Sequence, residues 1–398
     1  MSLQRRPLAA RAFEFLARVS NALQAWPNRM TPPAFRLLQI GSAFWQSRVL
    51  YVAARLDLAT VLADKPSSAA DLALKVGADP RALMRLLRML CAMGIFDELS
   101  PGTYRNNKLS NALRSDRPDS VRAMVLMHNS AEMSRPWFEQ LEQGIRSGEV
   151  PFRLQHGQDL YDYMDSHAEF DALFAQAMDQ VEALTGDSFA TEFDWKAFDR
   201  VIDVGGSKGA KSMAILKRHP HLQALVVDRA QTIRNAASYW REHQGAGVTE
   251  CLARMRFEAG DLLASVPAAT SPRDAYLLSA VLHGFDDDSC VQALRTVARA
   301  AAEKGAAIVL LEMLMPEQKA DLSSASFDMQ MLMGTRGCER TRGEWERVFE
   351  RANLRLLEIV NLASFGKMLV LRPAPGNSGT GSVCPAADFA DRGVDEPA

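Results

Sequence analysis

Three aspartates stand where apolar segments end, and carboxylates in such places can bind a nucleotide-like ligand. Asp203 ends the run VID, Asp228 ends ALVVD, and Asp261 follows MRFEAG. Short apolar runs between helical stretches predict buried parallel strands, whose carboxyl ends meet at the sheet edge where α/β folds bind ligands. There Asp203 would pair with an ammonium group, Asp228 would accept hydrogen bonds from ribose hydroxyls, and Asp261 would lie near an adenine.

The turn GGSKGAKS (205–212) limits the choice of ligand. A Walker A loop needs a glycine before its lysine, where this chain has Ala210. The dinucleotide fingerprint GxGxxG fails at Ser207 and again at Ala210. S-adenosylmethionine carries no phosphate and needs small residues that let the backbone approach, which Gly205, Gly206 and Gly209 provide. Each aspartate alone could cap a helix, but the three together predict S-adenosylmethionine as the cofactor.

The composition argues against several other classes of protein. The chain has 398 residues, enough for two or three domains, and its net charge of −2 favours neither nucleic acid nor an anionic membrane as a partner. The five cysteines and seven histidines lack the spacing of disulfides or metal ligands, so we predict reduced thiols, a cytoplasmic location and no metal. Charged residues interrupt the N-terminal segment, so it lacks the uninterrupted apolar core of a secretory signal peptide. No apolar run is long enough for a transmembrane helix.

The secondary structure predicted to position these residues differs between the N-terminal and C-terminal parts of the chain. After Asp194, apolar strands alternate with helical stretches, which predicts an α/β domain with a largely parallel sheet. The stretch 67–107 predicts helix, turn, helix and hairpin, a winged-helix pattern whose second helix begins after the cap Asp79. Arg81, Arg85 and Arg88 share one face of that helix, and we interpret them as a solvated stripe or one that faces acidic residues of another element, because the chain lacks the basic field that DNA binding needs.

Changes in predicted secondary structure and composition divide the chain into five parts. We expect an N-terminal helical arm at 1–33, a winged-helix-like domain at 34–130, a helical linker at 131–195, a cofactor-binding domain at 196–372 and a disordered tail at 373–398. The tail is rich in Pro, Gly, Ala and Asp, which is typical of disordered segments.

From about residue 34 to 372 the chain resembles the class I S-adenosylmethionine-dependent O-methyltransferases, a family that includes plant-type and bacterial enzymes of small molecules. The resemblance is carried, in this order, by VIDVGGSKG, LVVD, AGDLLASVP, LSAVLHGFDDDSC, VLLEMLMPE and GCERTRGEWERVF. It implies a Rossmann-like domain with a mostly parallel seven-stranded sheet, preceded by a mainly helical winged-helix domain that serves dimerisation and not DNA binding. It therefore implies a homodimer, with S-adenosylhomocysteine as a product.

The resemblance also implies a catalytic histidine. His283 in AVLHGF matches the family's general base, and Glu312 in LLEML and Glu339 in GCERT match the glutamates that flank it. A phenol titrates near pH 10, so a positioned imidazole with a pKa of about 6.5 can take its proton while the methyl group is transferred. A carboxylate beside the ring fixes its tautomer and stabilises the imidazolium.

Other positions follow the family or depart from it. Leu262, in GDLL, is expected beside the cofactor, and Ser279 stands near the adenine where relatives often have a lysine. Gly284 and Phe285 follow the histidine where relatives have Asp and Trp. Ser207 replaces a usual glycine, which the turn tolerates if its backbone avoids positive φ. Relatives touch the acceptor with the helix before the cofactor domain, where this chain has Phe174 and Met178. Met331, in DMQMLM within the cofactor domain, is expected to join them.

These observations together predict a homodimeric, metal-independent O-methyltransferase that acts on a hydroxyl of a small aromatic secondary metabolite. Two alternatives stay open. A relative that retains S-adenosylmethionine could carry out decarboxylation, hydroxylation or cyclisation, and a winged-helix regulator could sense S-adenosylmethionine and bind DNA.

Overall fold

The computed structural model describes residues 4–5, 8–243, 245 and 247–374, so the tail expected at 373–398 lies outside the described residues from position 375 on. The largest element is an eight-stranded sheet in the order β1-β10-β11-β9-β8-β5-β6-β7. Its strands are β1 (Gln4–Arg5), β5 (Arg200–Val204), β6 (Gln223–Asp228), β7 (Met255–Ala259), β8 (Asp274–Ser279), β9 (Ala307–Met313), β10 (Leu354–Asn361) and β11 (Gly366–Pro373).

The sheet is mostly parallel, as expected. Strands β9, β8, β5, β6 and β7 run parallel, and β11 runs antiparallel between β9 and β10. The seven-stranded sheet is confirmed, and β1 adds a strand that the sequence did not predict by pairing in parallel with β10. The register sets Asp203 opposite Leu277 and Asp228 opposite Ala259, so both aspartates lie at the carboxyl edge.

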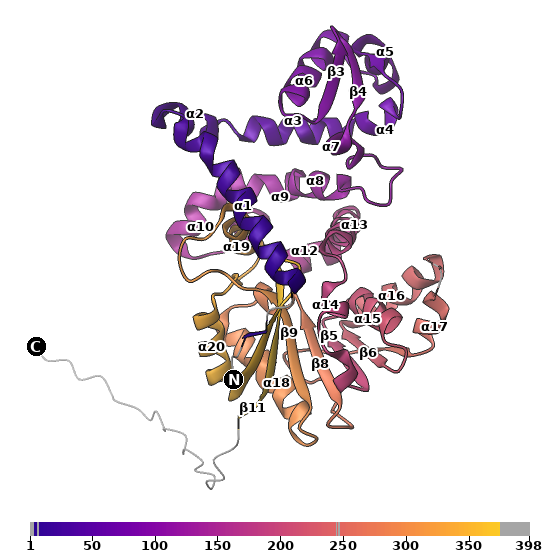
Figure 1. The fold of residues 1–398 in the computed structure, drawn as a ribbon, viewed down its shortest axis with the longest axis vertical. Helices are drawn as coiled ribbons and strands as arrows, with labels where there is room; N and C mark the ends of the chain where they lie inside the picture. The colour runs from indigo at the N-terminus through magenta and orange to yellow at the C-terminus, as the bar shows by residue number, and fades with distance from the viewer. Residues whose placement is uncertain (1–3, 6–7, 244, 246, 375–398) are drawn as a thin grey trace, which may run out of the picture.

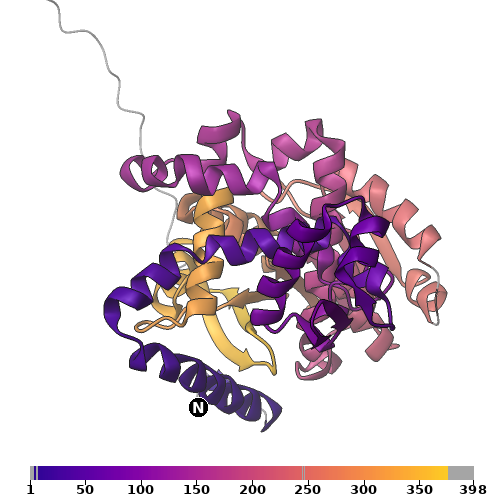
Figure 2. The ribbon, with the colours of Figure 1, turned by 90° about the horizontal axis from the view of Figure 1, so that it is seen from above.

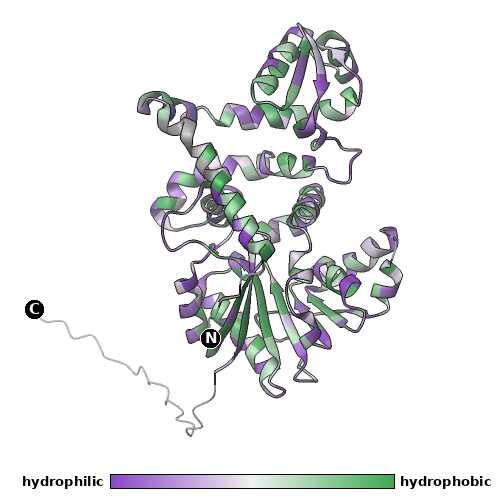
Figure 3. Ribbon diagram, viewed as in Figure 1, coloured by the Kyte–Doolittle hydropathy of each residue, from purple (hydrophilic) through white to green (hydrophobic). Residues whose placement is uncertain are grey.

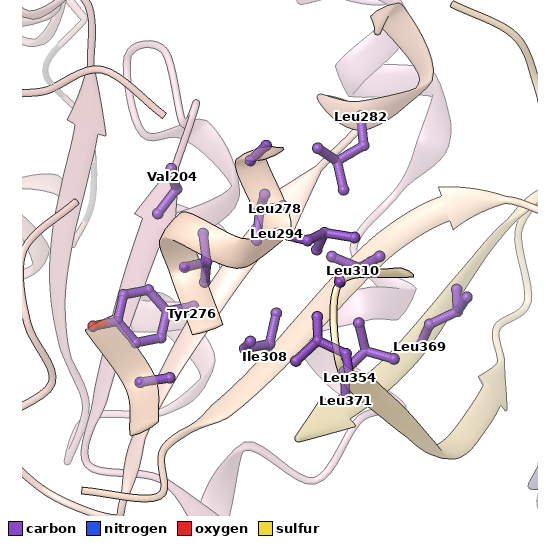
Figure 4. Packing of buried hydrophobic residues seen from close by; sticks show 14 of the residues in the cluster. Val204, Tyr276, Leu278, Leu282, Leu294, Ile308, Leu310, Leu354, Leu369 and Leu371 are labelled. Atoms are coloured by element: carbon purple, nitrogen blue, oxygen red, sulfur yellow. The ribbon is translucent and has the colours of Figure 1, made fainter. Parts of the chain in front are cut away.

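Helices cover both faces of the sheet, because successive strand residues point to opposite sides. Tyr276 and Leu278 pack with helices α18 (Asp287–Ala302) and α20 (Arg342–Arg351), in the cluster of Figure 4. Ala275 and Leu277 face the other side, where they pack with α14 (Ser188–Thr191), α15 (Ala210–Arg218), α16 (Ala230–Glu242) and α17 (Val248–Leu252). The strands accordingly show as hydrophobic in Figure 3.

The winged-helix part lies at the opposite end of the molecule from this sheet (Figure 1). It contains α4 (Leu58–Leu62), β2 (Ser67–Ser68), α5 (Ala69–Val76), α6 (Pro80–Ala92), β3 (Phe96–Ser100) and β4 (Thr103–Asn106). The predicted cap is present, because the Asp79 carboxylate accepts the Ala82 amide at 2.8 Å. The two expected strands are joined by β2, which gives a small sheet of order β2-β4-β3.

A middle layer of helices separates the two ends of the molecule (Figure 1). These helices are α8 (Arg122–His128), α9 (Ala131–Arg135), the π-helix η1 (Pro136–Gln140), α10 (Leu141–Ser147), α11 (Pro151–His156), α12 (Leu160–Ser166), α13 (Ala168–Thr185) and α19 (Leu322–Gly334). The short α7 (Lys108–Asn111) precedes them in the chain and contacts α4 and β4 of the winged-helix part. Helix α8 packs on α13, and α19 packs on α11. The short 3₁₀-helix η2 (Trp195–Ala197) then leads into β5 of the large sheet.

The N-terminal arm expected at 1–33 contains α1 (Leu8–Met30), and α2 (Pro33–Gly41) and α3 (Phe44–Arg55) follow it, with α3 packing on α6. Figure 2 shows α1 at the rim of the molecule, beside the C-terminal strands. Glu14 pairs there with Lys367 at 3.6 Å, and Phe13 contacts Phe365 edge to face. Within the described part of the chain, no helix is both long and apolar enough to cross a membrane.

Candidate active site

The turn between β5 and α15 has room for glycine and little else. A Cβ atom at Gly205 would lie 2.7 Å from a methyl group of Val281, and one at Gly206 would lie 2.6 Å from the carboxyl carbon of Asp203. Gly209, with φ +78°, would bring a Cβ within 2.9 Å of Val226. The three glycines therefore let the backbone of the turn pack directly onto the carboxyl edge of the sheet.

Asp203 lies beneath this turn and is 1% exposed. Its Oδ2 atom accepts a hydrogen bond from the Ser212 hydroxyl at 2.7 Å, while its Oδ1 atom has no hydrogen-bond partner. Burial raises the pKa of Asp203 to about 6. A buried carboxylate with an unpaired oxygen is costly, and a nearby cation would stabilise its charged form.

Asp228 holds the middle of the same turn. Its Oδ2 atom accepts the backbone amide of Ser207 at 2.8 Å, and its Oδ1 atom accepts the amide of Arg229 at 2.7 Å. Ser207 has φ +52°, so the condition that it avoids positive φ is not met. The left-handed conformation costs roughly 1–2 kcal/mol for a residue with a Cβ, and the hydrogen bond to Asp228 helps to offset that cost.

The remaining predicted cofactor residues line the same edge. Asp261 is exposed after β7, and its Oδ1 atom accepts the Leu263 amide at 2.9 Å, as in a local turn. Leu262 is half-buried and packs against the core cluster on the side of α18. Ser279 ends β8 and is half-buried, and Ala280 after it has φ +51°. Strand ends and turns thus bring all these predicted residues to one edge.

Helix α13 is joined to the glycine turn by two ion pairs. Lys208 in the turn pairs with Asp179, and Lys211 at the start of α15 pairs with Glu182 at 3.0 Å. Burial lowers the pKa of Lys208 to about 8. The helix that carries two of the predicted acceptor-contacting residues is therefore anchored beside the predicted cofactor turn.

His283 lies in a 3₁₀ turn, η3 (Leu282–Gly284), that follows β8. Its Nδ1 atom is 2.8 Å from Oε1 of Glu339 and 4.0 Å from Oε2 of Glu312. The histidine side chain is 25% exposed, whereas the two glutamates are 1% and 3% exposed. The structure thus brings together three residues that are far apart in the sequence, and the histidine alone of the three reaches the surface.

The charges of this cluster alter its protonation. Burial alone would lower the pKa of His283, but the negative charges of Glu312 and Glu339 outweigh burial and raise it to about 9. Burial raises the pKa of Glu312 to about 7, against the opposing effect of His283. When the ring is neutral, it is consequently a stronger proton acceptor than an ordinary imidazole.

The two glutamates act on different parts of the histidine turn. Glu339 bonds to the ring, whereas Oε1 of Glu312 accepts the backbone amides of Val281 and Leu282 at 3.2 and 3.0 Å. Each glutamate also has a buried Oε2 atom without a hydrogen-bond partner. Glu312 therefore fixes the entry into the turn, and Glu339 fixes the ring.

The sequence reasoning missed Gly337 and Arg340. A Cβ atom at Gly337 would lie 1.9 Å from the carbonyl oxygen of His283, so only glycine fits there. Arg340 is 1% exposed and donates to backbone carbonyls of the histidine turn. Both residues lie in GCERT, where only Glu339 was assigned a role from the sequence.

The predicted acceptor residues lie in the middle layer. Phe174 on α13 is half-buried and contacts the ring of Phe170, and Met178, one helical turn later, is 36% exposed. Met331 on α19 is half-buried. The side chains of Gln330 on α19 and His128 on α8 approach at 3.3 Å and connect the helices that carry these residues.

Two further features bear on the chemistry. A surface hollow of about 470 Å³, lined by α15 with Asp187 and Trp240, includes Ala210 from the turn but none of the residues predicted to bind the cofactor or the acceptor and none of the histidine cluster. Among the residues that the structure describes, no group of three or more His, Cys, Asp or Glu side chains could hold a metal ion.

A mostly parallel sheet with helices on both faces, a glycine turn without a phosphate-binding pattern and a helical N-terminal part together define the class I methyltransferase fold. Residues 138–355 match the O-methyltransferase domain model and residues 38–116 match the O-methyltransferase dimerisation domain model. The chain therefore belongs to the O-methyltransferase family.

Similar proteins agree with this assignment. The chain is 31% identical over 337 residues to phenazine O-methyltransferase PhzM of Lysobacter antibioticus, covering 85% of this chain and 95% of that protein. The crystal structure of LaPhzM has a TM-score of 0.78 at 30% identity and covers 86% of this chain and all of that one. The structure of CalO1, a methyltransferase in calicheamicin biosynthesis in its S-adenosylhomocysteine-bound form, has a TM-score of 0.72 at 29% identity and covers 86% and 98%. The chain is accordingly an S-adenosylmethionine-dependent methyltransferase.

Proposed function

We propose that this enzyme transfers a methyl group to a hydroxyl of a small aromatic secondary metabolite, with His283 as the general base. The observation that carries the proposal is the geometry of one ring. Nδ1 of His283 is held by Glu339 at 2.8 Å, and the partly exposed ring lies at the carboxyl edge that also bears the glycine turn. The relatives that match include O-methyltransferases of phenazine and puromycin-type compounds.

The ring can take a proton in this arrangement. Because Glu339 accepts from Nδ1–H, the neutral ring keeps its proton on Nδ1 and offers the lone pair of Nε2 to an acceptor hydroxyl. When Nε2 takes the proton, the two buried glutamates stabilise the resulting imidazolium. Glu312 adds a second effect, since it holds the backbone just before the ring.

The residues at the sheet edge fit S-adenosylmethionine. When bound, this cofactor supplies a methyl group on a positively charged sulfur, open to in-line attack. We assign its ammonium group to Asp203, whose buried Oδ1 atom lacks a partner, and its ribose to Asp228. Asp261, Leu262 and Ser279 would line the adenine, and the three turn glycines would admit the cofactor close to the backbone.

We further propose that Phe174, Met178 and Met331 line the acceptor. Two of them sit on α13, which ion pairs anchor to the glycine turn, and their apolar side chains suit a flat aromatic ring.

The proposed assembly is a homodimer. Its support is the dimerisation domain match together with several large apolar side chains of α1, α2 and α3 that are more than half exposed. These side chains include Leu16, Leu23, Phe35, Leu38 and Trp45. Arg81, Arg85 and Arg88 on α6 are exposed, in keeping with a solvated stripe, and we do not propose nucleic acid as a partner. A cytoplasmic location is also a proposal, supported by the free thiols of Cys91, Cys251, Cys290 and Cys338.

The test is His283→Ala, assayed with candidate phenols. We expect kcat to fall by about 10²–10⁴, the usual contribution of a general base, while calorimetry gives an unchanged affinity for S-adenosylhomocysteine. His221→Ala is the matched control, because this exposed histidine precedes β6 at the opposite end of the sheet and should leave kcat unchanged.

Product mass separates the proposal from the alternatives. A gain of one methylene group that depends on His283 supports methyl transfer. An altered product without that gain, formed while the cofactor stays unspent, would instead indicate decarboxylation, hydroxylation or cyclisation.

A further inference from the structure

One buried arginine holds the turn that carries His283. The guanidinium of Arg340 donates from Nη2 to the carbonyl oxygen of Phe285 at 2.8 Å and from Nη1 to that of Leu282 at 3.3 Å. Its Nε atom donates to Oδ1 of Asp287 at 2.8 Å, at the start of α18. These acceptors come before and after His283 in the chain, so a single side chain spans the turn on both sides of the ring.

The arginine is itself fixed in place. Its guanidinium lies over the buried ring of Trp345, 5.0 Å from the ring centroid, and only 1% of the side chain is exposed. Gly337, three residues earlier, packs against the carbonyl group of His283. The segment 337–340 thus touches the histidine turn at the backbone through Gly337, at the ring through Glu339 and on either side through Arg340.

We propose that Arg340 is a positioning residue for His283, which fixes the 282–285 turn so that Nδ1 stays on Glu339 and the other ring nitrogen faces the acceptor. The planar fork of a guanidinium can serve two carbonyl oxygens and a carboxylate at once, which a lysine ammonium cannot do in the same geometry. The inference rests on the proposed role of His283 as the base.

The position of the His283 ring affects the rate of proton removal. A misplacement of about 1 Å at a reacting group can cost about 10²-fold in rate. Arg340 contacts backbone carbonyls of the turn and of Cys338, the Asp287 carboxylate and the Trp345 ring, and none of these groups is assigned to the cofactor or the acceptor. Its effect on catalysis therefore passes through the position and the protonation of the His283 ring. Its positive charge also lowers the pKa of His283, against the two glutamates.

The decisive variant is Arg340→Lys, which keeps the charge and loses the fork. We expect kcat to fall at least tenfold, the affinity for S-adenosylhomocysteine to stay within twofold, and the pH at which activity rises to stay unchanged. Arg340→Met should lower kcat as well and also move that rise to higher pH, because the opposing positive charge is lost. Arg351→Lys is the control, since that exposed arginine on α20 pairs with Asp288 and does not touch the turn.

A double-mutant cycle with His283→Ala separates a positioning role from a merely structural one. If Arg340 acts through the ring, Arg340→Lys causes no further loss of kcat once the ring is gone. The same loss with and without His283, or wild-type kcat in Arg340→Lys, overturns the inference. Full activity of His283→Ala alone would instead refute the proposed base, and it would be seen before any arginine variant is made.

A second pair of variants keeps the test decisive if Arg340→Lys does not fold. Asp287→Asn removes one anchor of the guanidinium and leaves both carbonyl contacts, and we expect a several-fold loss of kcat that disappears in the His283→Ala background. Asp288→Asn is its matched control, one residue further along α18 and largely exposed. Equal kcat in the two asparagine variants would overturn the inference.

Discussion

The protonation of His283 gives a prediction that can be read from a pH profile. Its pKa is raised to about 9 by Glu312 and Glu339, and only the neutral ring can act as a base. Activity should therefore rise with pH until about pH 9, and not level off near the ordinary histidine pKa of about 6.5. At neutral pH, below this raised pKa, only a minor fraction of the free enzyme would carry a neutral ring.

Glu339→Gln should move this rise to lower pH. The substitution removes the charge from the 2.8 Å contact with Nδ1, and a hydrogen bond to a charged group contributes about 1.5–3 kcal/mol. Because one pKa unit corresponds to about 1.36 kcal/mol, the rise should shift down by about 1–2 units. The plateau should also be lower than in the wild type, since the variant holds the ring less firmly and makes it a weaker base.

The assay is kcat/KM for the acceptor between pH 6 and 10, with transfer followed by a labelled methyl group. Glu346→Gln is a suitable control, because this exposed glutamate on α20 pairs with Arg342 and does not touch the cluster. A rise near pH 6.5 in the wild type, unchanged in Glu339→Gln, would refute the view that these carboxylates set the protonation of the base.

Two other predictions concern the cofactor edge and metals. Asp228→Ala removes the acceptor of the Ser207 and Arg229 amides, and it should weaken S-adenosylhomocysteine binding by more than tenfold in calorimetry, since a charged hydrogen bond contributes about 1.5–3 kcal/mol. Wild-type affinity would remove Asp228 from the site, and Asp199→Ala at the opposite end of the sheet serves as the control. Turnover should survive EDTA because proton removal is assigned to His283, whereas a loss that magnesium restores would contradict that assignment.

Local patterns predicted the features that local physics decides. The cap at Asp79 depends on neighbours in sequence, and the glycine turn follows directly from the end of a predicted strand, and both are present. The shared edge of Asp203 and Asp228 followed from the topology of parallel strands, whose carboxyl ends must meet. These predictions needed only strand order and turn chemistry.

Contacts between distant segments were out of reach of the same reasoning. The pairing of β1 with β10 joins two segments near opposite ends of the chain, and the sequence of a two-residue strand is too short to predict its partner. The contact of Gly337 with the His283 carbonyl belongs to the tertiary structure, since 54 positions separate the two residues in the sequence. The positive φ of Ser207 also depends on a tertiary contact, the hydrogen bond to Asp228.

Gly284 and Phe285, the two departures from the family beside the histidine, differ from the residues that hold His283 in place. Phe285 stands where relatives have Trp, yet its carbonyl oxygen is the atom that Arg340 binds, so this anchor does not depend on the side chain. Gly284 stands where relatives have Asp, and a Cβ atom built there would meet nothing within 4 Å. The contacts that hold His283 come instead from Glu339 on the ring and from Glu312 and Arg340 on the backbone. Neither departure removes one of these contacts, so the turn that carries His283 keeps its anchors with Gly284 and Phe285 in place.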